Sequence, residues 1–290
     1  MISVDRDRNI IIIVRYNYLP AEAYVSLIYN LMKITVAKDA GYCFGVRDAV
    51  ELAYKSAREH GNVYMLGDIV HNEKVVEDLN SAGAKVVDSI DKIPQDKPVL
   101  LRAHGTKNGV WNSAKRKGLK VLDATCPLVH EIHNEVKQLA NDGRQIIVIG
   151  DHGHDEVVAI ADQVKQTIII SSVKEAKKIK KYKRAGVVSQ STQTIENVQE
   201  IISILMKKVF DLHFVNTICY PTKRNQEQIK ELAKKYDIMI IIGSFTSANS
   251  KRLTELAKNI NKNSYQVTDS SELDSNWFKD VGSVGISAGA

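Results

Sequence analysis

The clearest indication of the fold is the stretch LKVLDATCPLVHEIHNEVKQLANDGRQIIVIGDHGHDE, residues 119–156. Its first apolar run, at 119–122, predicts a strand that ends shortly before Cys126. The segment after this cysteine opens with a proline and repeats apolar residues every three or four positions, which predicts an amphipathic helix. A second apolar run ends at Gly150, and His154 follows four residues later. The stretch therefore predicts a strand, a helix that starts at a cysteine, and a second strand that leads to a histidine.

This register occurs three times in the chain. A cysteine precedes each helical pattern, a glycine at the end of an apolar strand lies 24 residues further on, and a histidine or serine lies 28 residues further on. The three copies are Cys43, Gly67 and His71; Cys126, Gly150 and His154; and Cys219, Gly243 and Ser247. Further strands lead to polar turns, which are RAHGT at 102–106, SQST at 189–192 and SAGA at 287–290. The repeat predicts three versions of one structural unit.

Strands that alternate with helices predict an α/β fold of parallel units. Ligands of such sheets bind where strands end and helices begin. Three units packed around a pseudo-threefold axis, as a trefoil, would bring their cysteines, histidines and polar turns to one central cavity. We expect α/β domains at 32–125, 126–218 and 219–290, after an N-terminal extension at 1–31. The sequence leaves open whether this extension is native, because Met32 directly precedes the first predicted strand.

Composition and charge exclude several classes of protein. The net charge of +6 is spread over 290 residues, which does not favour a nucleic-acid partner. The basic stretch KEAKKIKKYKR, residues 174–184, is expected to form the solvated face of an amphipathic helix. No apolar run reaches the roughly 18 residues that a membrane span requires. The apolar run at 10–14 is flanked by charges and lacks a cleavage site, so it is a poor signal peptide and we expect a cytoplasmic protein.

The three cysteines, an odd number without an export signal, argue against a disulfide framework. Thiolates are metal ligands, and a helix N-terminus favours the thiolate. A 4Fe-4S cluster that receives three cysteines in place of four keeps one iron open for a substrate. A three-cysteine zinc site and three buried structural cysteines are the alternatives that the repeat alone leaves open.

Several further motifs occur in a characteristic order. They are GYCFGV at 41–46, IVHNE at 69–73, RAHGT at 102–106, DATCPLV at 123–129, GDHGHDE at 150–156, SQST at 189–192, CYPT at 219–222 and GSFTSANS at 243–250. With the terminal SAGA, residues 32–290 closely resemble the 4-hydroxy-3-methylbut-2-enyl diphosphate reductase (LytB) family. DATCPLV and the three-cysteine register are the most specific of these signals.

The resemblance implies a trefoil of three α/β domains around one 4Fe-4S cluster held by Cys43, Cys126 and Cys219. It implies reductive removal of the allylic hydroxyl of the substrate as water, with two electrons and two protons, to give isopentenyl and dimethylallyl diphosphates. This is the last step of the methylerythritol phosphate pathway to isoprenoids. Glu156 matches the glutamate of the proton relay in the family, and Ser191 takes the place of the threonine hydroxyl of that relay. Reduced ferredoxin or flavodoxin is the implied electron donor.

The diphosphate must be bound without a P-loop, because the chain has no Walker A sequence. His71, His104 and His154 are expected to donate from imidazoles, and the repeat register supports the first and last of these. Ser247 and Asn249 would complete the binding site with neutral groups. Asn72 and Thr222 match positions of the family that line the cavity, although each is equally well explained as a helix cap. Thr192, in SQST, is a further candidate for substrate binding. The other histidines lack an equivalent position and are expected to be structural or exposed; they are His60, His130, His133, His152 and His213.

The chain departs from the family at several positions. Asp155 stands where a proline is usual, Ser191 where a threonine is usual, and Ala248 where a second serine is usual. Family members also continue beyond SAGA with a serine that helps to bind the diphosphate and with a helix, so we expect the third domain to be incomplete at Ala290. Two other functions stay open: an iron–sulfur redox sensor without catalysis, and a zinc-stabilised phosphate-binding module.

Overall fold

The structure is a computed structural model that describes residues 32–289. The extension at 1–31 and the terminal Ala290 lie outside the described residues. Two compact units make up the chain. The larger one is Tyr42–Lys223, and the smaller one combines the described residues up to Gly41 with those from Arg224 onward.

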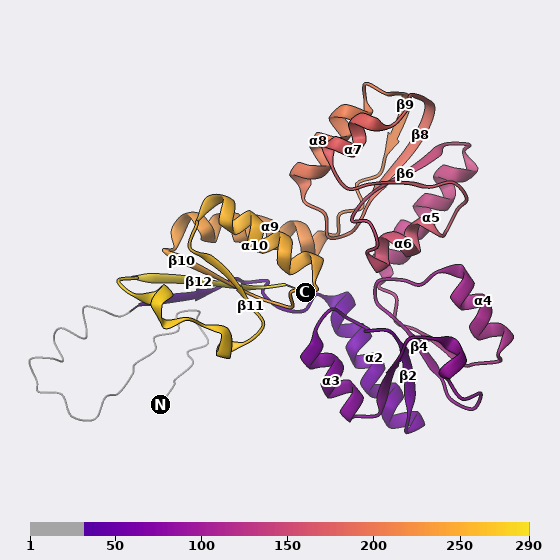
Figure 1. Cartoon of the computed structure of the whole chain (residues 1–290), viewed down its shortest axis with the longest axis horizontal. Helices are drawn as coiled ribbons and strands as arrows, with labels where there is room; N and C mark the ends of the chain where they lie inside the picture. The colour runs from indigo at the N-terminus through magenta and orange to yellow at the C-terminus, as the bar shows by residue number, and fades with distance from the viewer. Residues whose placement is uncertain (1–31, 290) are drawn as a thin grey trace, which may run out of the picture. The chain divides into compact units, whose positions relative to one another are not determined.

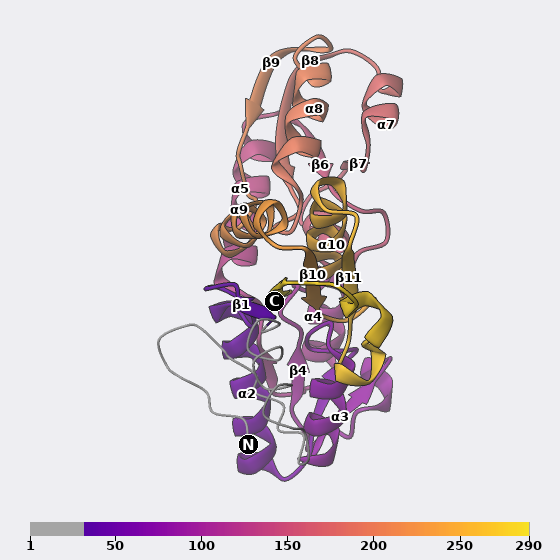
Figure 2. The ribbon, with the colours of Figure 1, turned by 90° about the vertical axis from the view of Figure 1, so that its left-hand side faces the viewer.

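The larger unit contains two four-stranded parallel sheets (Figure 1). The first sheet has the order β3-β2-β4-β5 and the second has the order β7-β6-β8-β9. The strands of the first sheet are β2 (Val63–Leu66), β3 (Ala84–Val87), β4 (Val99–Leu101) and β5 (Val121–Asp123). Those of the second are β6 (Gln145–Ile149), β7 (Ile168–Ile170), β8 (Tyr182–Ser189) and β9 (Val209–Phe214). In Figure 2 the long strand β8 runs beside β9.

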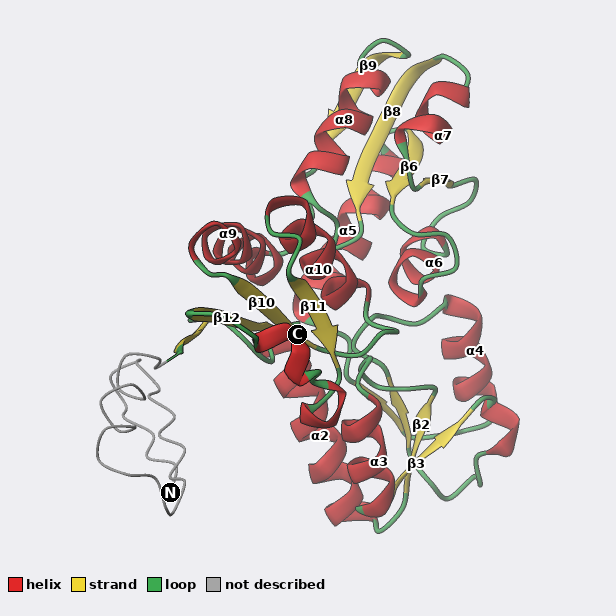
Figure 3. Cartoon of the chain, turned by 60° about the vertical axis from the view of Figure 1, so that its left-hand side comes forward, coloured by secondary structure: helices red, strands yellow, loops and turns green. Residues whose placement is uncertain are grey.

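The smaller unit contains the third sheet, again parallel, with the order β11-β10-β12-β1. Its strands are β1 (Lys33–Val36), β10 (Ile238–Ile242), β11 (Ser264–Val267) and β12 (Ser283–Ala288). Figure 3 shows α9 (Tyr220–Lys235) and α10 (Ala248–Ile260) beside these strands. Both helices pack against β10, through Ile229 and Leu253 among others.

All three sheets share one strand order when the strands are matched by their place in the repeat. The strand that leads to a cysteine always pairs at the edge of the sheet of the preceding copy, as β5 does with β4 and β9 with β8. The strand before Cys43 follows the same rule, with the last copy in place of a preceding one: β1 pairs with β12, with Ile34 opposite Val284. The first strand, which the sequence analysis placed in the domain at 32–125, therefore belongs to the sheet at the end of the chain.

Helices cover both faces of the first two sheets. One face takes the helices that follow the cysteine and the histidine, which are α2 (Phe44–His60) and α3 (Glu73–Ser81) in the first copy and α5 (Pro127–Asn141) and α6 (Asp155–Ala161) in the second. The opposite face takes α4 (Asn108–Arg116) with a 3-10 turn at Ile90–Lys92, and α7 (Val173–Lys178) with α8 (Ile195–Leu205). In the third sheet, 3-10 turns at Ser270–Glu272 and Ser275–Phe278 replace this last helical layer, and Phe278 packs on the core.

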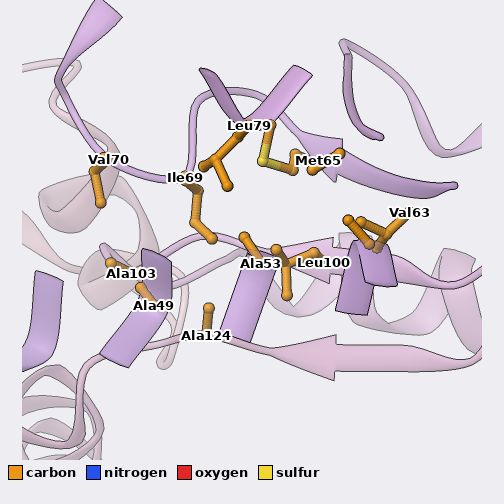
Figure 4. Close-up of a cluster of buried hydrophobic side chains, with 12 residues drawn as sticks. Ala49, Ala53, Val63, Met65, Ile69, Val70, Leu79, Leu100, Ala103 and Ala124 are labelled. Atoms are coloured by element: carbon orange, nitrogen blue, oxygen red, sulfur yellow. The ribbon is translucent and has the colours of Figure 1, made fainter. Parts of the chain in front are cut away.

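The core of the first sheet shows how small residues permit close packing. Ala53 of α2 lies beside Leu100 of β4, Ala49 lies beside Ala103, and all four are buried (Figure 4). Burial of a leucine side chain contributes roughly 1.5–3 kcal/mol. Close packing at this face fixes the start of α2, where Cys43 lies.

The basic stretch at 174–184 forms a helix only in its first part, which corrects the expectation of one solvated helical face. α7 ends at Lys178, and Ile179 is extended with φ −65° and ψ 151°. The Lys208 ammonium donates to the carbonyls of Lys177 and Ile179 at 2.7 and 2.6 Å, so these acceptors are satisfied without further helix. Tyr182–Arg184 then opens β8. No helix among residues 32–289 is long and apolar enough to cross a membrane.

Candidate active site

The cysteines lie at helix starts, as the repeat predicts. Cys43 is the N-cap of α2, and Cys126 is the N-cap of α5, with Pro127 in the first turn. Cys219 directly precedes α9. The backbone N–H of Cys126 donates to the Ala103 carbonyl at 3.0 Å, and that of Cys219 donates to the Ser191 carbonyl at 2.9 Å. The RAHGT and SQST turns of one copy therefore position the cysteine of the next.

Cys126 lies close to the start of α2. A Cβ atom added to Gly45 would lie 2.4 Å from the Cys126 sulfur, so only glycine permits this approach. Burial raises the pKa of the Cys126 thiol, and the nearby Cys43 and Glu156 raise it further. Cys43 and Glu156 also raise the pKa of the Cys219 thiol. The three cysteines and Glu156 therefore lie close enough to interact electrostatically.

Cys219 is partly buried, like the other two cysteines. Burial raises its pKa to about 11, against a hydrogen bond with Thr222 that lowers it. The Cys219 sulfur and the Thr222 hydroxyl are 3.0 Å apart. A buried thiolate without a cation is costly, so this position favours the thiol until a positive group compensates it. Among the described residues, no three His, Cys, Asp or Glu side chains are grouped to hold a single metal ion.

Glu156 is a buried carboxylate with a dedicated hydroxyl partner. Its side chain is 2% exposed and lies in the first turn of α6. One carboxylate oxygen accepts from the backbone N–H of Ser191 at 2.6 Å, and the other accepts from the Ser191 hydroxyl at 2.7 Å. A carboxylate joined to a hydroxyl in this way can pass a proton along the pair.

Three imidazoles form a cluster in the same unit. The ring centroids of His71 and His104 are 4.2 Å apart, and the His154 ring lies 5.5 Å from the first and 5.8 Å from the second. His154 is the N-cap of α6, and its Nδ1 accepts from the backbone N–H of Glu156 at 3.2 Å. The structure therefore brings together the three histidines that the sequence analysis selected.

Burial favours the neutral form of the first two imidazoles. Desolvation lowers the pKa of His71, and Arg102 lowers it further while Asp155 opposes the shift. Desolvation lowers the pKa of His104 well below its usual value, with the other two histidines and Arg102 acting in the same direction. The buried Nε2 of His71 and the buried Nδ1 of His104 have no hydrogen-bond partner among the described residues. A neutral imidazole keeps one N–H to donate, so the cluster suits a ligand rich in acceptor oxygens.

The SQST turn contributes a second polar layer. The Gln190 amide donates to the Thr192 hydroxyl at 2.9 Å, and its carbonyl accepts from the backbone N–H of Asp151 at 3.0 Å. Ser191 and Thr222 are buried, and Thr192 is partly exposed. These residues lie in the same unit as the cysteines and the imidazoles.

The smaller unit contains the residues selected from the third copy. Ser247 is the N-cap of α10 and accepts from the Ser250 N–H at 3.3 Å. Asn249 is 5% exposed, and its side-chain oxygen has no hydrogen-bond partner within the part of the chain that the structure describes. Both residues are therefore polar groups held at a strand-to-helix turn.

The sequence model for LytB protein matches residues 34–290, which is most of the chain. The chain belongs to the LytB family.

Two relatives show how far the similarity extends. A 4-hydroxy-3-methylbut-2-enyl diphosphate reductase of Geobacter sulfurreducens is 37% identical over 260 residues, which cover 89% of this LytB chain and 92% of that protein. The reductase of the same name from Aquifex aeolicus is 36% identical over 265 residues, 90% of this chain and 91% of that one.

Solved structures of LytB relatives share the three-sheet α/β fold. One, titled as (E)-4-hydroxy-3-methyl-but-2-enyl diphosphate reductase, the terminal enzyme of the non-mevalonate pathway, has a TM-score of 0.67 at 36% identity, over 89% of this chain and 93% of that one. The E-1-hydroxy-2-methyl-but-2-enyl-4-diphosphate reductase of Plasmodium falciparum has a TM-score of 0.85 at 27% identity, over 89% of this chain and 83% of that one.

Sequence reasoning missed three contributors to this LytB site. Arg102 forms an ion pair with Asp155, Gln190 organises the SQST turn, and Gly45 makes room for Cys126. Arg102 and Gln190 stand inside motifs that were already recognised, so their position next to His104 and Ser191 was an available signal. Gly45 also stands inside a recognised motif, GYCFGV, but its contact with Cys126 depends on tertiary packing that the motif does not specify.

The remaining histidines lie apart from the imidazole cluster. His130 pairs with Asp123 at 2.9 Å and His152 with Glu175 at 2.8 Å, and both histidines are exposed. His60 lies 3.3 Å from the Lys120 ammonium, and His213 is exposed. His133 is 7% exposed in α5, and burial lowers its pKa to about 4.

Proposed function

We propose that the chain catalyses the reductive dehydroxylation of 4-hydroxy-3-methylbut-2-enyl diphosphate to isopentenyl and dimethylallyl diphosphates, the last step of the methylerythritol phosphate route to isoprenoids. The observation that carries this proposal is the Glu156–Ser191 pair, buried in the neighbourhood of three thiols and connected through His154 to the imidazole cluster. This combination offers a proton donor, metal ligands and an oxygen-binding site within one unit. The names of the relatives at 36–37% identity support the same reaction.

Cys43, Cys126 and Cys219 would hold one 4Fe-4S cluster. Three thiols at helix starts match its donor chemistry, and burial that raises the pKa of two of them leaves a site whose thiolates require a cation. When bound, the cluster supplies electrons and an iron with an open position that acts as a Lewis acid. The proposed trefoil around it has one α/β domain for each of the three sheets, and their shared strand order supports it. The first strand, β1, belongs to the last of these domains.

Glu156 would deliver the proton that lets the substrate hydroxyl leave as water. A hydroxyl is a poor leaving group unless it is protonated, and a positioned acid contributes typically 10²–10⁴-fold to such a step. The Ser191 hydroxyl and a Glu156 carboxyl oxygen are 2.7 Å apart. With Glu156 protonated, its O–H would donate to the Ser191 oxygen, the Ser191 hydroxyl would give its own proton to the substrate oxygen, and Glu156 would be left as the carboxylate. The overall reaction consumes two electrons and two protons for each hydroxyl lost.

The diphosphate would be bound by hydrogen-bond donors that the fold collects from several turns. His71, His104 and His154 would donate from neutral imidazoles, as their clustering and the unpartnered nitrogens of the first two support. The polar set at the other turns would complete the site; it comprises Ser191, Thr192, Thr222, Ser247 and Asn249. Reduced ferredoxin or flavodoxin would supply the electrons.

The deciding experiment measures iron, zinc and acid-labile sulfide per chain in protein purified without oxygen, followed by turnover of the hydroxylated diphosphate with a chemical reductant. We expect iron and sulfide in near-equal amounts and formation of both products. Zinc without sulfide would refute the proposal and indicate a zinc-stabilised phosphate-binding module. A cluster without turnover would replace it with a redox sensor, and in that case Glu156→Gln would leave the sensor signal unchanged.

A further inference from the structure

Arg102 and Asp155 form an ion pair between the two sheets of the larger unit. Arg102 follows the last residue of β4, and Asp155 is the first residue of α6. Their side chains are 26% and 35% exposed, so the pair is partly desolvated. Asp155 directly follows His154 in the sequence, and Arg102 comes shortly before His104. Each partner of the ion pair is therefore close in sequence to a histidine of the imidazole cluster.

Gly67 makes room for the guanidinium. Its φ is +70°, and an added Cβ would lie 3.2 Å from Nη1 and 3.3 Å from Cζ of Arg102. That separation is tighter than ordinary van der Waals contact, and the guanidinium is also held by its ion pair. The repeat glycine at the end of β2 therefore lets a cation approach the strand, in addition to permitting the turn.

The guanidinium still has a donor that no other described residue uses. The buried Nε of Arg102 has no hydrogen-bond partner among the described residues, as is true of His71 Nε2 and His104 Nδ1. Arg102 contributes to lowering the pKa of both imidazoles, so its charge acts on both rings. Buried donors without partners are rare, because each destabilises the protein until a ligand or water satisfies it.

We propose that Arg102 supplies the fixed positive charge of the diphosphate site, and that Asp155 is the positioning residue that holds the guanidinium beside His71 and His104. The inference rests on the proposed function, which requires a diphosphate at this cluster. Neutral imidazoles donate hydrogen bonds but do not balance a di- or trianion. A guanidinium never loses its proton, so it provides that balance at every pH at which the enzyme works.

Asp155 gives this chain its own version of the site. The family resemblance places a proline at this position, and proline offers no acceptor for an arginine. In this chain the carboxylate sits in the first turn of α6, where the helix dipole favours negative charge. It compensates the guanidinium before the ligand arrives and fixes the side chain in one place, which reduces the entropy lost on binding.

The test measures the dissociation constant of inorganic pyrophosphate by calorimetry on anaerobically purified protein that retains its metal. Arg102→Gln is expected to weaken binding about tenfold or more, since bonds to charged groups contribute more than neutral ones. Arg102→Lys is expected to restore part of this loss, because the charge remains. Arg184→Gln is the matched control: Arg184 also pairs with an aspartate, Asp211, at 3.0 Å, but lies at the start of β8. Equal dissociation constants for wild type and Arg102→Gln would overturn the inference.

A double-mutant cycle tests the role of Asp155. Asp155→Asn is expected to weaken pyrophosphate binding about threefold in the wild-type background, as suits a partly exposed ion pair, and to have no effect in Arg102→Gln. Tighter binding by Asp155→Asn, or an equal loss in both backgrounds, would overturn the positioning role. Turnover of the hydroxylated substrate is recorded for the same samples. Turnover by wild type without any effect of Arg102→Gln on binding would refute this inference and leave the proposed function intact.

Discussion

The Glu156–Ser191 pair and the His71–His104 pair lie in one unit but are built in opposite ways. Both oxygens of the Glu156 carboxylate accept hydrogen bonds from Ser191, at 2.6 and 2.7 Å. The two imidazoles stack at 4.2 Å and each keeps a buried nitrogen without a partner among the described residues. The hydrogen bonds of the Glu156–Ser191 pair are formed before any ligand binds, whereas the two imidazoles each keep a nitrogen for which a ligand could be the partner.

This difference suggests that the first pair serves proton transfer and the second pair serves binding of the diphosphate. A buried carboxylate is tolerated only when donors surround it, so the geometry of Glu156 does not depend on the substrate. The unpartnered imidazole nitrogens raise the free energy of the ligand-free protein, and a diphosphate would remove that cost. We therefore expect substitutions at the first pair to lower kcat and substitutions at the second to weaken binding.

Glu156→Gln should produce the largest effect. The amide keeps the shape of the side chain but cannot deliver a proton, so kcat should fall by about 10²–10⁴-fold. Steady-state turnover with a chemical reductant measures it. Pyrophosphate affinity should change less than about threefold, because the carboxylate is not part of the binding pair. A loss of pyrophosphate affinity as large as the loss of kcat would show that Glu156 also takes part in binding, which contradicts this division of roles.

His133 is a buried imidazole outside the cluster and should control acid stability. Its pKa is about 4 when folded and about 6.5 in an unfolded chain, so the unfolded state binds the proton first. The contribution of His133 is fully present above pH 6.5 and is lost as the pH falls toward 4, up to about 3 kcal/mol.

Urea unfolding of wild type and His133→Gln at several pH values measures this contribution. The difference between the two free energies of unfolding should shrink steadily between pH 6.5 and 4, because glutamine does not titrate. A constant difference over that range would show that folding does not shift the pKa of His133.

His104→Asn should weaken substrate binding about tenfold and change kcat less. The substitution removes one imidazole donor from the stacked pair while Glu156 keeps both of its bonds. KM, and pyrophosphate affinity as an independent measure, report the effect. His130→Asn is the control, since His130 is 48% exposed and pairs with Asp123 away from the cluster. A drop in kcat without a change in either binding measure would contradict the assignment.

The sequence predicted most of the fold because its repeat is periodic. The spacing from cysteine to glycine to histidine placed helix starts at Cys43 and Cys126, which the structure confirms. The pairing of β1 with β12 could not be predicted, because nothing in a strand of four residues specifies a partner about 250 residues away. The helix expected over the whole basic stretch was wrong for a related reason: Lys208, in the turn before β9, donates to the carbonyls of Lys177 and Ile179, where the helix ends.

The candidate site shows the same division. Residues with a repeat equivalent, such as His71 and His154, could be selected from spacing, and the structure places their rings 5.5 Å apart. Arg102 has no equivalent in the other copies, and its importance depends on Asp155, which lies 53 residues away and departs from the family pattern. Contacts of this kind between copies are set by packing, which a periodic pattern does not encode.

Ser191→Thr should have the smallest effect. Together with Ser191→Val, it tests whether the hydroxyl at this position takes part in proton transfer with Glu156. Ser191 is 7% exposed, so an added methyl group must be accommodated by its neighbours, at a cost that buried sites usually keep within about 1–3 kcal/mol of stability. Its hydroxyl would still reach Glu156, and kcat should stay within about threefold of wild type. Ser191→Val has the shape of threonine without the oxygen, and it leaves one carboxylate oxygen with no hydroxyl donor. If the valine variant also retained full kcat, the Ser191 backbone N–H alone would suffice to hold Glu156, and the hydroxyl would have no part in moving the proton.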